Sequence, residues 1–357
     1  MPANYLHGIE TTEVERGPRP VRVVKSAVIA LVGTAPVGPV NELTLCLNDT
    51  HAAQFGAHQS GFSIPEALQG IYDFGAGTVL VVNVLDPAIH NAKVTDQPQQ
   101  FADNDLLQLA HGALQTLQLK SADDSVTHGL GTDYTVNMLT GQIRRLATGS
   151  IVANAQIKVD YTHADPSQVT PADIIGGITL AGRRTGLKAF QDSYNQLGFF
   201  PKIFIAPGFS TLKAVTADLA ISAGQVGGVA YVDAPIGATV QQVLAGRGPS
   251  GAINFNTSSD RVRLCYPHVK VYDAATNGER LQPLSIRAAG LRAKVDHDHG
   301  YWWSSSNQPL LGVIGLERPL TARIDDATSE VNLLNENGIT TVFNAYGTGL
   351  RLWGNRT

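Results

Sequence analysis

Charged side chains are scarce in this sequence: they make up 16% of its 357 residues, whereas ordinary soluble domains carry about 25%. The net charge is −4, and the arginine pairs Arg144-Arg145 and Arg183-Arg184 stand apart instead of forming the basic stripe of a nucleic-acid binder. We therefore expect no nucleic-acid partner. Uninterrupted apolar runs of 18 residues are also missing, so the sequence predicts no membrane partner.

Cysteine is nearly absent as well, since the chain contains only Cys46 and Cys265. Two cysteines cannot form the disulfide framework of a small secreted protein, and both lie in apolar, strand-like sequence. We expect buried free thiols in a protein from a reducing compartment. Glu10, Glu13 and Glu15 precede any apolar run, which is the wrong pattern for a secretory signal.

The motifs of nucleotide-binding proteins and hydrolases are missing too. The loop Gly33–Pro39 follows an apolar run, as phosphate loops do, but it lacks the glycine spacing and the Gly-Lys-Ser/Thr ending of such loops. Its prolines have no backbone N–H to donate to a phosphate. Gly208-Phe209-Ser210 stands between a predicted strand and a predicted helix without a nucleophile elbow, so we predict that Ser210 caps the helix.

The acidic and histidine clusters also predict no reactive site. In Asp296-His297-Asp298-His299, four consecutive side chains can rarely all point at one ion, and we predict a polar loop. Asp325-Asp326 is expected to precede a helix, because the N-terminal helix dipole favours negative charge. The sequence therefore predicts no catalytic residue, no metal ligand and no cofactor.

Apolar residues, by contrast, are abundant: they form 43% of the chain, which excludes disorder of the whole molecule. Residues 26–32 and 78–84 are continuous apolar runs, typical of strands that are buried on both faces. Between them, residues 62–74 carry apolar side chains at helical spacing. Strand, helix and strand in this order predict an α/β layer with a parallel pair of strands.

We expect the chain to divide into three parts. Residues 1–20 show no helical period and end in Gly17-Pro18-Arg19-Pro20, which predicts an extended N-terminal arm. Residues 97–166 contain short alternating runs between turn signals and predict a small antiparallel β insertion. Residues 21–96 and 167–357 then form an α/β domain, so that the fold class is mixed α/β.

The α/β pattern resumes after the insertion, where helical spacing and apolar runs alternate along the chain. The expected helices lie at residues 187–197, 212–219, 238–244, 283–294 and 328–337. The expected strands lie at residues 202–206, 228–232, 262–272, 339–343 and 349–353. Long arms and open sheet edges usually serve strand addition between subunits. An α/β hydrolase or nucleotide-binding enzyme, or a receptor-binding module built on the insertion, stays open as an alternative.

Segments along nearly the whole chain share their order with one protein family. The similarity begins in His7–Val14 and Val28–Pro36, continues in Asp133–Val136, Thr140–Ile143 and Val159–Tyr161, and is strongest in Gly300–Asn307, Asn337–Thr340 and Gly349–Thr357. In these segments the sequence resembles contractile tail sheath proteins of bacteriophages and of phage-tail-like bacteriocins. Each segment is short, but their common order makes the resemblance specific.

The resemblance implies a mechanical function without an enzyme activity or a cofactor. Copies of such a protein stack as hexameric rings around a tail tube, and on triggering the rings rotate, shorten and widen to drive the tube through a bacterial envelope. The implied partners are sister sheath subunits, the tail tube protein, the baseplate and the tail terminator. The implied location is the tail of the virion, after assembly in the cytoplasm of the bacterial host.

The resemblance also implies where subunits touch. Residues 9–16, with Ile9, Thr12 and Val14, would be a strand donated to a neighbour, and Trp353 and Arg356 would lie at a second contact. Sheath proteins continue for about 100–150 residues beyond the position of Thr357, which suggests a truncated chain without the region that contacts the tube. The scarcity of charge fits a surface that faces sister subunits, because burying unpaired charge is costly.

Overall fold

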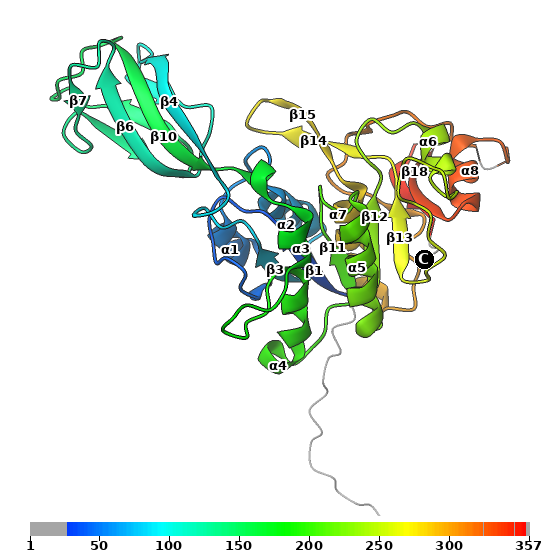
Figure 1. Ribbon diagram of the computed structural model, residues 1–357. Helices are drawn as coiled ribbons and strands as arrows, with labels where there is room; N and C mark the ends of the chain where they lie inside the picture. Colours follow the sequence, from blue (N-terminus) through cyan, green and yellow to red (C-terminus); the bar gives the residue numbers. More distant parts are fainter. Residues whose placement is uncertain (1–26, 324, 346, 355–357) are drawn as a thin grey trace, which may run out of the picture.

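The computed structural model describes residues 27–323, 325–345 and 347–354. A nine-stranded mixed sheet with helices on both faces forms the body of the molecule, and a smaller β insertion projects from one end of it (Figure 1). The mixed α/β fold predicted from the sequence is confirmed. None of the helices in these ranges is long and apolar enough to cross a membrane.

Six parallel strands form the centre of the large sheet. In spatial order they are β3 (Thr78–Asn83), β1 (Val28–Gly33), β11 (Ile203–Ile205), β12 (Val229–Asp233), β13 (Val262–Cys265) and β18 (Ile339–Ala345). Antiparallel strands extend both edges, with β2 (Thr44–Cys46) beside β3, and β19 (Gly349–Trp353) and β16 (Gln308–Pro309) beyond β18. Parallel strands need a cover on both faces, which explains why their sequences are continuously apolar.

Strand β1 shows how the two faces are filled. Ile29 and Leu31 pack into the core on one face, and Val28, Ala30 and Val32 pack into the core on the other. The first face is covered by α2 (Ser63–Tyr72) and α7 (Leu284–His299). The second is covered by η3 (Gly186–Asp192) and α5 (Lys213–Gln225), with α3 (Pro171–Ile175) and α4 (Ser193–Leu197) beside them.

Several shorter elements complete the body. Helices α6 (Val240–Ala245) and α8 (Glu330–Glu336) pack with β12, β13 and β18 in a third apolar cluster. A separate small sheet consists of β15 (Gly278–Gln282), β14 (Val269–Asp273) and β17 (Gly315–Leu316). The remaining single turns are α1 (Asp49–Ala52), η1 (Ala53–Phe55) and η2 (Pro166–Gln168). Both cysteines are buried free thiols, as predicted.

Three element predictions were wrong in detail. The expected strand 262–272 is divided between β13 and β14, which belong to different sheets, because Pro267 between them lacks the N–H that a continuing ladder needs. The expected helix 187–197 begins as the 3₁₀ helix η3 and only ends as α4. Helix α7 does not stop at Lys294 but reaches His299.

The extension of α7 has a local cause. Arg292 pairs with Asp296, and Lys294 pairs with Asp298 at 2.9 Å, each four residues apart, and such pairs stabilise a helix. Gly300 follows with a φ of +93°, a backbone conformation that favours glycine at a helix end. The segment 296–299, predicted to be a polar loop, is therefore the last turn of a helix.

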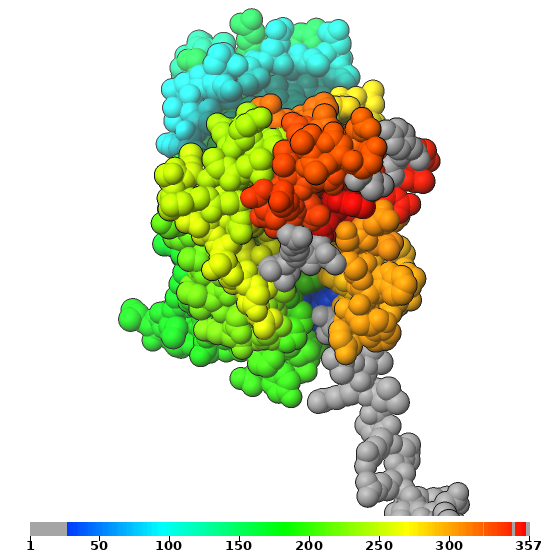
Figure 2. Space-filling model, turned by 90° about the vertical axis from the view of Figure 1, so that its right-hand side faces the viewer, coloured from blue at the N-terminus to red at the C-terminus, as the bar shows by residue number. Residues whose placement is uncertain are grey.

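The insertion consists of two antiparallel sheets around their own core. One sheet contains β4 (Asn91–Gln100), β10 (Gln156–Ala164), β6 (Leu114–Ser121) and β7 (Thr127–His128), and the other contains β5 (Leu106–Gln108), β9 (Gln142–Arg145) and β8 (Tyr134–Asn137). Buried side chains that include Leu119, Ile143 and Val159 fill the space between them. Figure 1 shows the insertion projecting from one end of the body, and Figure 2 shows its cyan part above the body.

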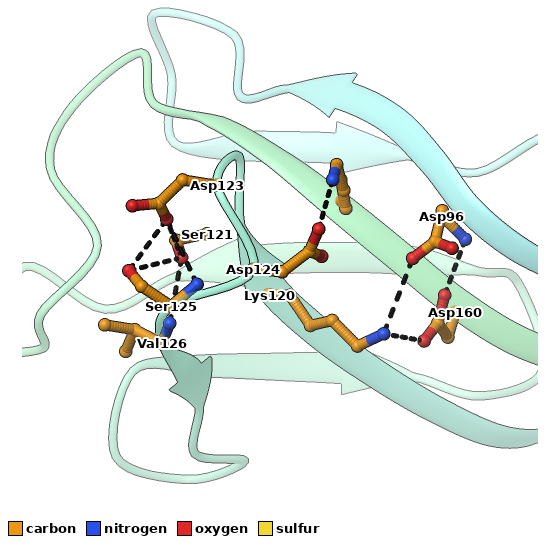
Figure 3. Close-up of polar contacts among 9 residues, drawn as sticks. Asp96, Lys120, Ser121, Asp123, Asp124, Ser125, Val126 and Asp160 are labelled. Carbon is orange, nitrogen blue, oxygen red and sulfur yellow. Dashed lines mark hydrogen bonds and ion pairs between the residues drawn. The ribbon is translucent and has the colours of Figure 1, made fainter.

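Charged side chains fix the bends of the insertion (Figure 3). Strand β4 bulges near Asp96, whose N–H donates to Asp160 Oδ1 at 2.6 Å. The ammonium group of Lys120 lies 2.6 Å from Asp160 Oδ2. The bonds from Asp96 N–H and Lys120 lower the pKa of Asp160. In the turn between β6 and β7, Asp123 Oδ1 accepts from Ser121 Oγ at 2.6 Å and from Ser125 Oγ at 2.8 Å.

A buried carboxylate joins α7 to the large sheet. Asp233, at the carboxyl end of β12, is 2% exposed. Its Oδ1 accepts the backbone N–H of Ser285 at 2.8 Å, and its Oδ2 accepts the Ser285 hydroxyl at 2.5 Å. Ser285 is in the first turn of α7, where backbone N–H groups lack helical partners and the helix dipole favours an anion. Asp233 therefore caps this helix from a neighbouring strand.

We predict that Ile143→Ala destabilises the insertion and leaves the body intact. Ile143 is fully buried, and truncating such a side chain costs about 2–5 kcal/mol. Hydrogen exchange followed by mass spectrometry should show faster exchange in β6, β9 and β10 and unchanged exchange in β1, β11 and β12. The matched control is Val152→Ala, at a residue 69% exposed, which should change neither. Equal acceleration in both parts would contradict an independent core.

The buried carboxyl of Asp233 should also make the stability of the folded protein depend on pH. Burial raises the pKa of this carboxyl above its ordinary 3.8, against the opposing effects of His268 and of hydrogen bonds from Ser285 and Ser210. The folded chain therefore binds this proton more tightly than the unfolded chain. Stability is greatest when the proton is bound and falls as the pH rises from about 4 through the raised pKa. Asp233→Asn removes this contribution.

Urea denaturation of both proteins between pH 4 and pH 8 measures the effect. The stability of Asp233→Asn relative to the parent protein should rise with pH. The control Asp326→Asn should show a stability difference that stays nearly constant over this range, because hydrogen bonds from Thr328 lower the pKa of Asp326 and the stabilisation by this carboxylate is lost only below about pH 4. If the stability difference between Asp233→Asn and the parent protein stays constant from pH 4 to pH 8, the raised pKa of Asp233 is contradicted.

Candidate intersubunit site

The carboxyl-terminal hairpin forms one edge of the large sheet and carries Trp353. Strand β19 pairs with β18 on one side and with β16 on the other. The indole ring of Trp353 lies against Phe343 of β18 in a tilted arrangement, with ring centroids 5.0 Å apart, and Trp353 is half-buried. The outer strand β16 contains Pro309, which lacks a backbone N–H and limits further strand pairing at this edge.

A buried arginine fixes the end of this hairpin. Arg263 of β13 is 4% exposed, and its Nη2 donates to the carbonyl of Gly354 at 2.6 Å. Its Nε donates to Thr340 Oγ1 at 3.0 Å, and its Nη1 donates to Ser305 Oγ at 3.3 Å. The guanidinium also lies over the ring of Tyr231, 5.3 Å from its centroid. One side chain thus joins β13, β18, the segment before β16 and the residue after Trp353.

At the place where nucleotide enzymes bind their ligand, two loop N–H groups are bound by the chain's own side chains. The strand order reverses between β1 and β11, and open α/β sheets bind ligands at the carboxyl ends of such strands. Here the N–H of Thr34 donates to Ser63 Oγ at 3.1 Å, and the N–H of Ala35 donates to Asn83 Oδ1 at 3.0 Å. These donors of the Gly33–Pro39 loop are therefore engaged and do not face a phosphate.

The other candidate side chains take part in structural contacts. Ser210 does not cap a helix as predicted, because α5 begins only at Lys213. Its hydroxyl donates to Asp233 Oδ2 at 3.3 Å and accepts the Asp233 N–H at 3.1 Å. Asp326 accepts from the N–H of Thr328 at 2.8 Å, ahead of α8. Within the described ranges, no three His, Cys, Asp or Glu side chains are grouped to hold a metal ion.

Comparison with known proteins decides the family. A family model described as the phage tail sheath protein central domain matches residues 177–357. The tail sheath protein of Burkholderia phage BcepMu is 60% identical over 359 residues, a match that covers 100% of this chain and 75% of that protein. The chain belongs to the phage tail sheath protein family. A second model, for a protein of unknown function, matches residues 87–172 of this sheath protein.

More distant relatives carry the same description. A putative prophage major tail sheath protein of Pseudomonas aeruginosa is 36% identical over 59% of this chain and 53% of its own length. The tail sheath protein of Escherichia phage P2 is 31% identical over 61% of this chain and 54% of its own length. Matches to these two proteins thus span about half of their length.

Solved sheath structures resemble this chain at low sequence identity. The contracted helical sheath of the anti-feeding prophage has a TM-score of 0.48 at 16% identity and covers 99% of this chain and 69% of its own. A sheath tail protein from Listeria innocua has a TM-score of 0.47 at 14% identity and covers 92% of this chain and 68% of its own.

The structure places only one of the five predicted contact residues of this sheath protein. Trp353 lies on β19, and Ile9, Thr12, Val14 and Arg356 lie outside the described residues. Sequence patterns did not single out Arg263, which holds the residue next to Trp353. The available signal was an arginine between apolar residues in a predicted buried strand, where an unpartnered charge would be costly.

We predict that Arg263→Met loosens the hairpin that carries Trp353. The Gly354 carbonyl and the hydroxyls of Thr340 and Ser305 lose a charged donor, and a buried polar group left unpaired costs about 1–3 kcal/mol. Urea denaturation should show this loss, and hydrogen exchange should be faster in β19. Arg261→Met is the control, because that side chain is 43% exposed and its loss should change stability by less than about 0.5 kcal/mol. Equal stability of both variants would contradict the anchoring of the hairpin by Arg263.

Proposed function

We propose that this protein is the structural subunit of a contractile tail sheath. Copies polymerise as stacked hexameric rings around a tail tube, and contraction of the rings drives the tube through the bacterial envelope. The observation that carries the proposal is the 60% identity, over the whole chain, to the BcepMu tail sheath protein. The central-domain match over residues 177–357 supports it independently.

The physical basis of contraction is a lattice with two arrangements. The extended lattice is metastable, and new subunit contacts in the contracted lattice release free energy. A small gain for each subunit adds up over many copies. Such a mechanism needs a subunit that rotates as a rigid body, and the large sheet covered on both faces supplies one. It needs no enzyme activity and no cofactor, and the family membership supports a non-enzymatic role.

Connections between subunits must survive the rotation. We propose that residues 9–16, with Ile9, Thr12 and Val14, add as a strand to a neighbouring copy, since main-chain hydrogen bonds persist when linked bodies rotate. Trp353 and Arg356 would lie at a second contact. The half-buried Trp353 on an anchored hairpin suits this role, because aromatic side chains on rigid elements dominate many interfaces.

The proposed partners follow from the sheath role. They are sister subunits, the tail tube protein, the baseplate and the tail terminator, met in the tail of the virion after assembly in the host cytoplasm. Three parts would have separate roles: residues 1–20 as the linking arm, residues 21–96 with 167–357 as the sheath domain, and residues 97–166 as the insertion, to which β4 adds the residues from Asn91 onward. The separate core of the insertion supports this division.

Electron microscopy of particles assembled with this protein tests the proposal. Striated hollow cylinders are the expected result, and monodisperse monomers under all conditions would contradict it. Val14→Pro should prevent long cylinders, because proline removes one N–H from the proposed donated strand and blocks its pairing. Ala3→Pro, outside residues 9–16, is the matched control and should assemble like the parent. Normal cylinders from Val14→Pro would rule out strand donation by this segment.

A further inference from the structure

Three aromatic side chains stand exposed on a turn directly after α7. We call residues 300–303 the aromatic turn: Tyr301 and Trp302 are each 73% exposed, and Trp303 is 50% exposed. Soluble proteins rarely expose several large apolar side chains side by side. Where they do, the exposed group commonly marks an interaction site. Tryptophan and tyrosine are also the residues that most often dominate binding energy at protein interfaces.

The aromatic turn is held in a fixed shape. The Nη1 of Arg292 donates to the Trp303 carbonyl at 2.6 Å, and the guanidinium also pairs with Asp296. The Trp302 ring covers Gly300, where a Cβ would come within 2.5 Å of it. The Tyr301 and Trp302 rings contact edge to face at 5.3 Å. A preorganised aromatic surface loses little conformational entropy on binding, which favours affinity.

A second exposed apolar group lies on the opposite face of the sheet. In residues 176–185, which we call the Leu180 loop, Leu180 is fully exposed and Ile178 is 69% exposed. The loop closes on itself, because the N–H of Thr179 donates to the Arg183 carbonyl and the N–H of Gly182 donates to the Thr179 carbonyl, both at 2.8 Å. Its tip is therefore a rigid apolar knob.

The Leu180 loop also carries positive charge that suits an aromatic partner. The side chain of Arg183 is 55% exposed, and its Nη1 lies 3.6 Å from Oε1 of the exposed Glu42. An arginine over the face of a tryptophan is attracted by the ring electrons, and the attraction grows when water is excluded. An apolar knob with an adjacent guanidinium complements a surface of two indole rings and a phenol ring.

The two surfaces face away from each other on one molecule. The aromatic turn follows α7, which covers one face of the sheet, and the Leu180 loop precedes η3, which covers the other face. In Figure 2 the orange part of the chain, around residue 300, and the green part, before α5, lie on opposite flanks of the body. Two different patches that match each other generate an open chain or ring of copies, whereas a closed dimer uses one patch twice.

We propose that the Leu180 loop of one copy docks on the aromatic turn of the next copy. The occupant is a second copy because the family forms sheaths and because this loop presents an apolar side chain beside an exposed arginine. The contact is head to tail and would link successive subunits of the lattice. This inference rests on the proposed function and adds to it a defined pair of contact surfaces.

Disulfide trapping between differently labelled copies tests the geometry. Ala181→Cys and Ser304→Cys, which flank Leu180 and the aromatic turn and keep both contact surfaces, are made in separate chains, which are mixed at high concentration and oxidised. The native thiols are buried and should not react. The mixture should yield a cross-linked dimer, whereas neither variant alone should. Val126→Cys in the insertion, at a residue 48% exposed, is the control partner and should not cross-link with Ser304→Cys.

Self-association measured by sedimentation gives the energetic test. Trp302→Ala should weaken it about 30-fold, the loss expected for an interface hot spot of about 2 kcal/mol. Arg183→Glu should weaken it as well, and Arg183→Lys should do so less. Because Trp302 and Trp303 become covered, association should also shift the tryptophan emission to shorter wavelength.

The outcomes separate this inference from the proposed function. Cross-links only between unlike variants, together with weaker association of Trp302→Ala, support the head-to-tail contact. Normal cylinders with no mixed cross-link, or with Trp302→Ala assembling like the parent, overturn the contact and leave the sheath function standing. Absence of any association or cylinder from the parent protein under all conditions overturns both.

Discussion

A buried carboxylate fixes the start of the helix that carries the aromatic turn at its other end. Asp233 accepts two hydrogen bonds from Ser285 in the first turn of α7 and so sets where this 16-residue helix starts against the sheet. Further along the helix, Arg287 donates to the Leu311 carbonyl at 3.0 Å and holds the loop after β16. Arg292, nearer its end, clamps the aromatic turn. The cap, the buried face of the helix and these two arginines together set the position of the exposed aromatic turn.

A contracting sheath needs such rigidity within a subunit and freedom between subunits. The large sheet, covered on both faces, leaves little room for internal rearrangement because close-packed cores are not continuously deformable. Two features fix the edge of the sheet formed by β16 and β19. Pro309 limits further pairing at β16, and Arg263 anchors the end of β19 from within the sheet. The molecule thus combines a rigid body with short, fixed surface elements, so that under the proposed function lattice changes would fall on contacts between copies.

Periodicity predicted the body of this fold, and side-chain chemistry explains where it failed. The apolar runs that became β1 and β3 are long enough to show burial on both faces, and the alternation in β10 marked a β insertion. The end of α7 could not be predicted from apolar spacing, because its last turn depends on pairs such as Lys294 with Asp298. The contacts of Ser210 and Arg263 could not be predicted for another reason: their partners lie 23 to 91 residues away in the sequence. Only the tertiary fold brings Asp233 to Ser210 or Gly354 to Arg263.

The most direct test of the account is a side-chain resolution reconstruction of a phage tail sheath that contains this protein, in extended and contracted states. We expect the large sheet, α7 and residues 300–303 to superpose between the two states within about 1 Å, while neighbouring copies rotate relative to one another. We also expect Asp233 to stay bound to the first turn of α7 in both. Separation of α7 from the sheet during contraction would contradict the account, as would a tail in which this protein forms no part of the sheath.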